Sequence, residues 1–261
     1  PRRCRTHQSI VYVGMTESKG TKIIEVRELC KEFDGKEVLN QINATFKPGS
    51  ISCIIGRSGA GKTVMLKCLI GLIQPTSGEI LFDGHSMMLL SKEQLKQLRQ
   101  VTGVLFQGSA LFDSMTVLEN VLFPLQLFSK LSSRERRVHA MALLDRVGLE
   151  GAQRKFPSEI SGGMMKRVAI ARAVALNPHY LFCDEPNSGL DPTTSASIDK
   201  LLKELTEEYQ ITTVINTHDM NSIKTIADHI LYLDKGQVAW QGSHEELRGN
   251  IPASLKNFLY L

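Results

Sequence analysis

The sequence predicts an α/β fold built around a mainly parallel β-sheet, and two observations lead to this prediction. Short apolar runs rich in β-branched residues alternate with helical patterns, as where "GSISCIIG" is followed by "TVMLKCLIGLI". Parallel strands that are buried on both faces have such continuous apolar runs, and helices connect them. Two later runs, "HYLFCDEP" and "ITTVINTHD", end in polar residues, as expected of strands that carry ligand-binding side chains at the carboxyl edge of a sheet.

The sequence predicts the following strands and helices for the first two thirds of the chain. "TKIIEVRELCKEF" and "EVLNQINATF" predict strands, "GSISCIIG" a buried parallel strand, "TVMLKCLIGLI" a helix against the sheet, and "GEILFDG" a further strand. Ser91 and Ser132 each stand three residues before a Gln or Glu, which is the spacing of a capping box, so a helix is expected after each. Most of the stretch 108–175 is predicted to be helical and inserted into the α/β core, and Asn177-Pro178 ends it.

The C-terminal part of the chain contains a predicted hairpin and a short helix. "HILYLDKGQVAWQG" is typical of a β-hairpin that turns at Lys235-Gly236. In "IPASLKNFLYL" the apolar residues have helix-like spacing. A helix this short is not stable alone, so it is expected to dock on its own core or on a partner, and the first is favoured.

Composition and charge exclude several functional classes. The chain has 261 residues, 42% hydrophobic and 22% charged, which is typical of a soluble globular protein. Its net charge of +4 comes largely from Arg2, Arg3 and Arg5; without them the 31 basic residues fall to 28, against 27 acidic residues. The near-neutral body argues against a nucleic-acid partner. Met15 has the character of a natural start, so the sequence leaves open whether the basic tail, residues 1–14, is native.

Membrane spans and disulfides are likewise not expected. No segment approaches the roughly 18–20 uninterrupted apolar residues of a membrane span, so any membrane role must involve partners. The five cysteines show no C-x-x-C spacing, which argues against a zinc site and favours a reducing cytosol. Cys53 and Cys183 lie in apolar runs and are interpreted as buried core thiols.

The segment "GRSGAGKT", residues 56–63, matches the phosphate-loop pattern G-x-x-x-x-G-K-[ST] between a predicted strand and a predicted helix. Glycines let backbone N–H groups converge on an anion, and the helix N-terminus adds partial positive charge. Lys62 is expected to reach the β- and γ-phosphates, and the Thr63 hydroxyl to ligate Mg²⁺. An ordinary glycine-rich turn is the alternative. The predicted nucleotide-binding residues here are Gly56, Arg57, Ser58, Gly59, Ala60, Gly61, Lys62, Thr63 and Val64.

Polar side chains after three other predicted strands complete the candidate site. Asp184 and Glu185 end "YLFCDE"; Asp184 is expected to hold Mg²⁺ and Glu185 to orient or deprotonate the attacking water. A solvated strand end is the alternative. His218, after "VINT", is predicted to bond the γ-phosphate, although a single His is often structural. Gln107 is expected to touch Mg²⁺ or the water, or else to be an ordinary surface residue. Lys62, Glu185 and His218 are thus the predicted catalytic residues, and Thr63, Gln107 and Asp184 the predicted metal ligands.

Along the chain the phosphate loop is followed by Gln107, "ISGGM" (160–164), "LFCDE" (181–185), "SGLD" (188–191) and His218. This order of motifs resembles that of ATP-binding-cassette (ABC) ATPases, and the resemblance covers residues 21–242. The resemblance implies a RecA-like P-loop NTPase core with an antiparallel β subdomain and an inserted helical subdomain, and ATP and Mg²⁺ as cofactors. It also implies that Phe33 stacks on adenine, although Phe33 is equally compatible with a core position. The implied boundaries are 15–106 and 176–248 for the two parts of the core, 107–175 for the helical subdomain and 249–261 for a tail.

The segment Ser161, Gly162 and Gly163 resembles the family's signature motif, which acts in trans on ATP held by a second subunit. A capped helix N-terminus with two bare glycines offers a hydroxyl and exposed N–H groups to a phosphate. The resemblance therefore implies a head-to-tail homodimer that encloses two ATP molecules, with Asp191 also at the interface. Met164 stands where the family usually has Gln, so a hydrogen bond to the partner is lost and packing of Met164 is expected instead.

The segments "FQGSALFDSMTVLENVLFPL", "EISGGMMKRVAIARAVALNP" and "DEPNSGLDP" resemble the ATPase subunits of maintenance-of-lipid-asymmetry transporters. This implies phospholipid movement at the cytoplasmic face of a bacterial inner membrane, with permease subunits and a mammalian-cell-entry (MCE) domain protein as partners. Residues 106–127 would line a permease groove, or form subdomain core. The alternatives are an importer or exporter of another solute, or a soluble ABC protein acting on DNA or ribosomes. The latter usually has a coiled coil or two cassettes, and this chain has neither.

Overall fold

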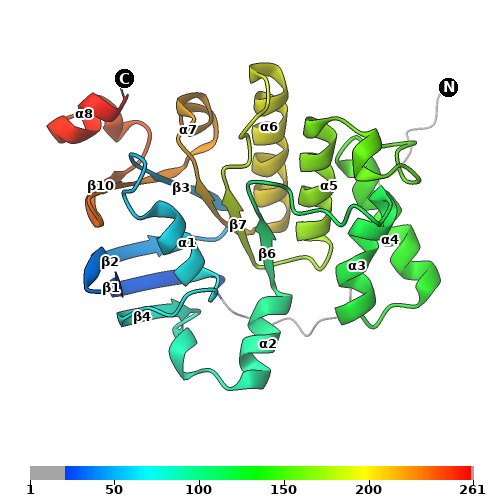
Figure 1. The fold of residues 1–261 in the computed structure, drawn as a ribbon, viewed down its shortest axis with the longest axis horizontal. Coiled ribbons are helices and arrows are strands. Elements are labelled where there is room, and N and C mark those ends of the chain that lie inside the picture. The colour runs from blue at the N-terminus through cyan, green and yellow to red at the C-terminus, as the bar shows by residue number, and fades with distance from the viewer. Residues whose placement is uncertain (1–20, 260–261) are drawn as a thin grey trace.

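The computed structural model describes residues 21–259, which form two β-sheets and a group of helices (Figure 1). The larger sheet has six strands in the order β10-β9-β3-β8-β7-β6. Its strands are β3 (Ser50–Ile55), β6 (Thr102–Leu105), β7 (Tyr180–Asp184), β8 (Thr212–Asn216), β9 (His229–Asp234) and β10 (Gln237–Gly242). All neighbouring pairs are parallel except β9 and β10, which form the predicted hairpin around Lys235 and Gly236.

The smaller sheet is antiparallel, with the strand order β2-β1-β4-β5. Its strands are β1 (Ile24–Phe33), β2 (Lys36–Phe46), β4 (Ser77–Phe82) and β5 (His85–Ser86). The Tyr180 hydroxyl of β7 donates to Asp83 after β4, at 3.0 Å. Asp83 also accepts from the backbone N–H of Ile23 at 2.9 Å, so one carboxylate ties the two sheets together.

Helices connect the strands, and α3, α4 and α5 lie together on the side of the molecule opposite β1 and β2 (Figure 1). The helices are α1 (Lys62–Leu69), α2 (Lys92–Gln100), α3 (Val117–Phe128), α4 (Ser133–Arg146), α5 (Gly162–Val174), α6 (Pro192–Tyr209), α7 (Met220–Ile226) and α8 (Ala253–Leu259). Short 3₁₀ turns span Met87–Leu89, Pro157–Glu159 and Glu246–Arg248. The capping boxes predicted at Ser91 and Ser132 are confirmed, and Thr116 begins α3 in the same way.

The two faces of the larger sheet are covered by different helices. Successive residues of a strand point to opposite faces, and along β3 Cys53 belongs to one hydrophobic cluster and Ile54 to the other. The cluster with Ile54 includes Met65 of α1, whereas the cluster with Cys53 includes residues of α5 and α6. Helix α1 therefore lies on one face, and α5 and α6 lie on the other.

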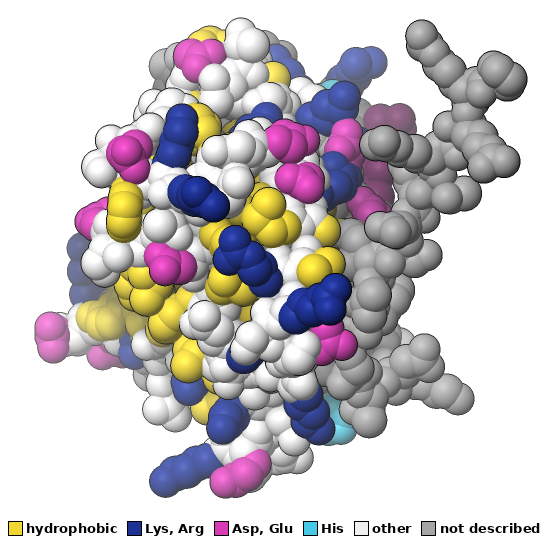
Figure 2. Space-filling model, turned by 90° about the vertical axis from the view of Figure 1, so that its right-hand side faces the viewer, with side chains coloured by type: hydrophobic (Ala, Val, Ile, Leu, Met, Phe, Trp, Pro, Cys, Tyr) yellow, Lys and Arg dark blue, Asp and Glu magenta, His cyan; other side chains and the backbone are white. Residues whose placement is uncertain are grey.

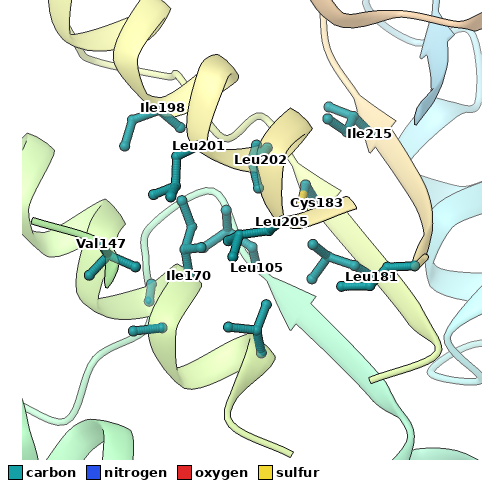
Figure 3. Close-up of a cluster of buried hydrophobic side chains, with 14 of the residues drawn as sticks. Leu105, Val147, Ile170, Leu181, Cys183, Ile198, Leu201, Leu202, Leu205 and Ile215 are labelled. Carbon is teal, nitrogen blue, oxygen red and sulfur yellow. The ribbon is translucent and has the colours of Figure 1, made fainter. Parts of the chain in front are cut away.

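The core between α5, α6 and the sheet is continuous (Figure 3). Leu202 and Leu205 of α6 lie beside Ile170 of α5 and Leu105 of β6, all at most 1% exposed. Burying a Leu or Ile side chain contributes about 1.5–3 kcal/mol, so this cluster holds the inserted helices firmly on the sheet. Cys183 lies in the same core and is fully buried, which confirms its interpretation as a core thiol; Cys53 is also fully buried.

The α/β class, the antiparallel β-sheet and the inserted helices are thus confirmed, while the subdomain boundaries stay predictions. Helix α8 docks on its own chain, because Leu255 is fully buried and the Phe258 ring lies 5.6 Å from that of Tyr232. The basic segment 1–14 lies outside the described residues. Within the described range of 21–259, none of the helices has the length and apolar character needed to cross a membrane.

Candidate nucleotide-hydrolysis site

The loop between β3 and α1 has a backbone that requires glycine at two positions. Gly56 has φ 152°, and a Cβ there would lie 2.3 Å from the carbonyl oxygen of Leu233. Gly61 has φ 103°, and a Cβ there would lie 2.7 Å from Leu39 Cδ2 of the β1–β2 hairpin. Any side chain at either position would collide with its neighbours, so the glycine pattern follows from the way the loop is enclosed.

The exposed part of this loop forms a cradle around the Lys62 ammonium group. Lys62 Nζ donates to the backbone oxygen atoms of Gly56 at 2.8 Å and Arg57 at 3.1 Å. Arg57, Ser58 and Gly59 are exposed, whereas Ala60 is buried and Val64 is half-buried. Burial lowers the pKa of Lys62, and the Glu185 and Asp184 carboxylates oppose that shift. A partly desolvated cation beside open backbone suits a polyphosphate.

Side chains from α1, β7 and β8 meet beside Lys62. Asn216 Nδ2 donates to Asp184 Oδ1 at 2.5 Å and lies 3.4 Å from Thr63 Oγ1. Asp184 and Asn216 are also partners in the parallel register of β7 and β8. A hydroxyl and a carboxylate are hard oxygen ligands, and Asn216 Oδ1 is buried without a hydrogen-bond partner. This donor set therefore fits Mg²⁺.

Glu185 and His218 form a close pair at the same edge of the sheet. His218 Nδ1 lies 2.8 Å from Glu185 Oε1, and the Glu185 side chain is 16% exposed against 71% for His218. Glu185 has φ 49° and donates its backbone N–H to the carbonyl oxygen of Asn216 at 2.8 Å. This turned backbone directs the Glu185 side chain away from the strand and toward the His218 ring.

Gln107 lies in the loop after β6 and contacts the loop after β7. Its side-chain amide donates to Ser188 Oγ at 3.3 Å, and within residues 21–259 it has no hydrogen bond to Thr63 or Asp184. Its backbone oxygen accepts from Lys166 Nζ of α5. The structure therefore brings Gln107 to the edge of the site, beside the segment 188–191, without placing it among the metal ligands.

The start of α5 gives the two signature glycines different roles. Ser161 Oγ accepts from the backbone N–H of Met164 at 3.3 Å, so Ser161 is the N-cap, and both Ser161 and Gly162 are exposed. A Cβ at Gly162 would have only one neighbour, 3.7 Å away, whereas a Cβ at Gly163 would lie 2.6 Å from Thr194 Cγ2 of α6. The prediction that both glycines serve a phosphate is therefore incomplete, because Gly163 also permits close packing of α5 on α6. Met164 is half-buried against the core.

Phe33 ends β1 and is 41% exposed, so the alternative that it belongs to the core is wrong. Lys31 Nζ lies 4.7 Å from the centre of the ring. The neighbouring strand β2 contributes Leu39, which touches the phosphate loop at Gly61. An exposed aromatic face near this loop can stack on a nucleobase.

The apolar residues of 106–127 are divided between a core and a surface. Val117 and Val121 are fully buried, but Phe106 and Phe112 are each 40% exposed. Arg172 of α5 holds this loop by donating to the backbone oxygens of Ser109 and Ala110, at 2.8 Å each. Hydrophobic side chains are grouped among basic ones on the face formed by the helices α3–α5 (Figure 2). The core interpretation of this segment is thus confirmed for Val117 and Val121, whereas Phe106 and Phe112 lie at the surface and their contact with a permease stays a prediction.

The sequence model of the ABC transporter family matches residues 39–188. The chain belongs to this family. A probable ribonucleotide transport ATP-binding protein from Mycobacterium leprae is 39% identical over 90% of the chain and 68% of its own length. A methionine import ATP-binding protein from Pseudomonas fluorescens is 41% identical over 89% of the chain and 72% of its length. Matching relatives from Mycobacterium tuberculosis are covered over 66% of their length, so the chain spans about two thirds of such proteins.

Solved structures of ABC cassettes have the same fold. The dimeric post-hydrolysis state of the cassette MJ0796 bound to ADP and Pi superposes with a TM-score of 0.77, at 34% identity over 87% of this chain and all of that chain. The cassette cbiO1 from Clostridium perfringens superposes with a TM-score of 0.80, at 34% identity over 86% of this chain and 90% of that chain. The implied ABC ATPase fold is therefore confirmed. The two relatives described above are named for ribonucleotide transport and methionine import, so the finer resemblance to lipid-asymmetry transporter ATPases with an MCE partner is not confirmed.

Sequence reasoning missed two polar residues at this site, Asn216 and Lys166. Asn216 stands two residues before His218, at the polar end of an apolar run, and this position is the signal that could have identified it. Lys166 lies within the helical pattern after the signature, where a charged residue is normally solvent-exposed, yet it is 4% exposed. Only the fold shows that its ammonium group is turned inward to Gln107.

Proposed function

We propose that this chain hydrolyses Mg-ATP as a head-to-tail homodimer and thereby drives a membrane permease that carries a small polar solute. The observation that carries the proposal is the convergence of Lys62, Thr63, Asp184, Glu185 and His218 at the carboxyl edge of the larger sheet. Three of these side chains suit binding of a metal–polyphosphate complex, and the other two suit activation of water. An anion-binding loop alone would not need a carboxylate–imidazole pair beside it.

Each side chain has a distinct role in this proposal. Backbone N–H groups of the loop and Lys62 bind the phosphates, while Phe33 stacks on the base. Thr63 and Asp184 hold Mg²⁺, which when bound neutralises charge on the phosphates. Glu185 accepts a proton from the attacking water. An ionised carboxylate only accepts hydrogen bonds, so His218 donates from Nδ1 and fixes the orientation of Glu185.

The position of α5 supports the proposed dimer. Helix α1 and helix α5 cover opposite faces of the larger sheet. We therefore do not expect one chain to bind the same phosphate with both its phosphate loop and its exposed Ser161–Gly162 pair. A second copy placed head to tail can supply its α5 N-terminus to the first copy's loop. Solved relatives that are titled as dimeric cassettes support this arrangement.

The permease is proposed to dock on the face formed by α3 to α5. Hydrophobic side chains that are exposed in and between these helices suit contact with an amphipathic segment of a partner. They are Phe106, Phe112, Leu127, Phe128, Val138 and Phe156. Through this contact the chain would lie at the cytoplasmic side of a membrane. The cargo class rests on the relatives named for ribonucleotide transport and methionine import.

The test is transport by the complete complex. The tagged chain is purified with its permease, reconstituted into vesicles and assayed for ATP-dependent movement of methionine, a ribonucleotide and a labelled phospholipid. Movement of one polar solute, absent with Lys62→Ala, supports the proposal. ATP-dependent movement of the phospholipid alone would replace the solute by a lipid, and no ATP hydrolysis by the reconstituted complex would overturn the proposed enzyme activity.

A further inference from the structure

Beneath the Glu185–His218 pair lies a buried polar cluster to which no part of the proposed mechanism assigns a role. Asn187 Nδ2 donates to Asp199 Oδ1 at 2.7 Å and to Ser222 Oγ at 2.9 Å. Burial raises the pKa of the Asp199 carboxyl, and the neighbouring Ser222 and Asn187 side chains oppose that shift. The three side chains are 8%, 3% and 2% exposed, respectively. They close a triangle that joins the loop after β7, helix α6 and helix α7.

Two corners of this triangle are next to the two members of the Glu185–His218 pair. Asn187 follows Glu185 by two residues, in a turn closed by the Ser188 N–H on the Glu185 carbonyl oxygen at 3.2 Å. Ser222 follows His218 by four residues, in the first turn of α7. The segments that carry Glu185 and His218 are therefore joined twice. One contact is the 2.8 Å pair itself, and the other is the buried Asn187–Ser222 bond.

Packing around these segments is incomplete on one side. A cavity of about 160 Å³ lies beside the triangle, lined in part by Asn187, Leu190, Asp199 and Asp219. Side chains that border a cavity lack close contacts on that side, so the hydrogen bonds of the triangle add a positional restraint there. The cavity also gives the loop after β7 and the start of α7 room to move if the bonds are lost.

We infer that Asn187 is a positioning residue that sets the separation of Glu185 and His218 through its bonds to Asp199 and Ser222. This inference rests on the proposed ATP hydrolysis, because the pair matters for turnover only if Glu185 activates water. Asn187 touches neither phosphate nor water in this account. Its loss should lower kcat for ATP hydrolysis without weakening ATP binding, because the phosphate loop leads into α1, on the face of the larger sheet opposite α6.

The decisive variants exchange donor and acceptor within the triangle. Asn187→Asp removes the amide donor and places two buried carboxyls together; we expect kcat to fall about tenfold, with the KM for ATP changed less than about twofold. The double variant Asn187→Asp with Asp199→Asn restores one amide donor and one carboxylate, and should recover most of kcat. Thr206→Val is the matched control. Thr206 lies on α6, as Asp199 does, and the substitution removes its buried 2.7 Å contact with Thr213 of β8, away from the pair.

The outcomes separate this inference from the proposed function. Full-length variants are compared for kcat, KM and melting temperature. If wild-type protein hydrolyses ATP and folded Asn187→Asp does so equally well, or loses no more kcat than Thr206→Val, the positioning role is wrong. If Asn187→Asp does not fold, Ser222→Ala decides the question, because it keeps the Asn187–Asp199 bond; unchanged kcat would contradict the inference. A wild-type protein without ATP hydrolysis would overturn the proposed function itself and, with it, this role.

Discussion

His218 Nδ1 lies 2.8 Å from Glu185 Oε1, although 33 residues separate them in the sequence. The contact is possible because β7 and β8 are parallel neighbours whose carboxyl ends meet. It places an imidazole where it can orient the carboxylate that is proposed to activate water. The predictions below follow from this pair, from the phosphate loop and from the contacts that hold both in place.

Glu185→Gln should abolish most ATP hydrolysis while leaving ATP binding intact. The amide has the shape of the carboxylate and can still accept from His218, but it cannot take a proton from water. Loss of a general base typically costs about 10²–10⁴-fold in rate. Because ATP would persist between two subunits, the variant with Mg-ATP should elute at twice the monomer mass in size-exclusion chromatography with light scattering. A variant that remains monomeric with ATP would count against the composite site.

Lys62→Ala should weaken ATP binding. The variant loses charge-assisted hydrogen bonds to the phosphates, each worth about 1.5–3 kcal/mol, so Kd should rise at least about tenfold. Fluorescence titration with an ATP analogue measures this. Lys67→Ala, an exposed lysine on the same helix, is the control and should bind as wild type. Equal Kd values for the two variants would exclude the assigned role.

The two signature glycines should respond differently to alanine. Gly163→Ala places a methyl group 2.6 Å from Thr194 Cγ2 in the same chain, so it should destabilise the fold by about 1–3 kcal/mol, measured by denaturant unfolding. Gly162→Ala meets no close neighbour in its own chain, so it should keep stability but lower kcat about 10- to 100-fold by displacing the partner's phosphate.

Thr194→Ser serves as the rescue for Gly163→Ala. It removes the colliding methyl group but keeps the hydroxyl that donates to Asp191 Oδ2 at 2.5 Å. The double variant should therefore recover stability. If Gly163→Ala is as stable as wild type, the packing role of Gly163 is wrong.

The Tyr180–Asp83 bond should stabilise the fold in a pH-dependent way. Burial raises the pKa of Tyr180, with further contributions from the Asp83 charge and hydrogen bond. A raised folded-state pKa gives stability that is present below the unfolded value of 10.0 and is lost as pH rises above it. Tyr180→Phe should therefore cost about 1 kcal/mol at neutral pH, and wild type should lose stability above pH 10 faster than the variant. Parallel urea unfolding of both proteins across pH 8–11 tests this, and identical slopes would contradict it.

How far the sequence predicts this site depends on how local each contact is. The phosphate loop is one continuous segment whose glycines, lysine and threonine act within eight residues, so its pattern was sufficient. The capping serines are equally local. By contrast, the Asp184–Asn216 contact depends on the register of β7 and β8, and the Gly163–Thr194 contact depends on how α5 crosses α6. Neither the strand register nor the helix crossing can be predicted from a single segment of the sequence.

The sequence pattern also does not predict which apolar side chains are exposed. The sequence left Phe33 and the apolar residues of 106–127 open between core and surface, because aromatic residues occur in both. The fold settles this by burying Val117 against the helices while leaving Phe112 at the surface. The cargo class lies further still from the sequence, since the roles proposed for these residues concern nucleotide and partner subunits and not cargo.

Mixing two inactive variants tests the central claim most directly. Lys62→Ala removes the function of the phosphate loop, and Ser161→Arg blocks the start of α5; each variant alone should be inactive. In a head-to-tail dimer of one subunit of each kind, the intact loop of the Ser161→Arg subunit faces the intact α5 of the Lys62→Ala subunit. The account predicts that the mixture regains ATP hydrolysis, measured as phosphate release. A mixture as inactive as its separate components, although the subunits exchange, would contradict a site shared between two chains.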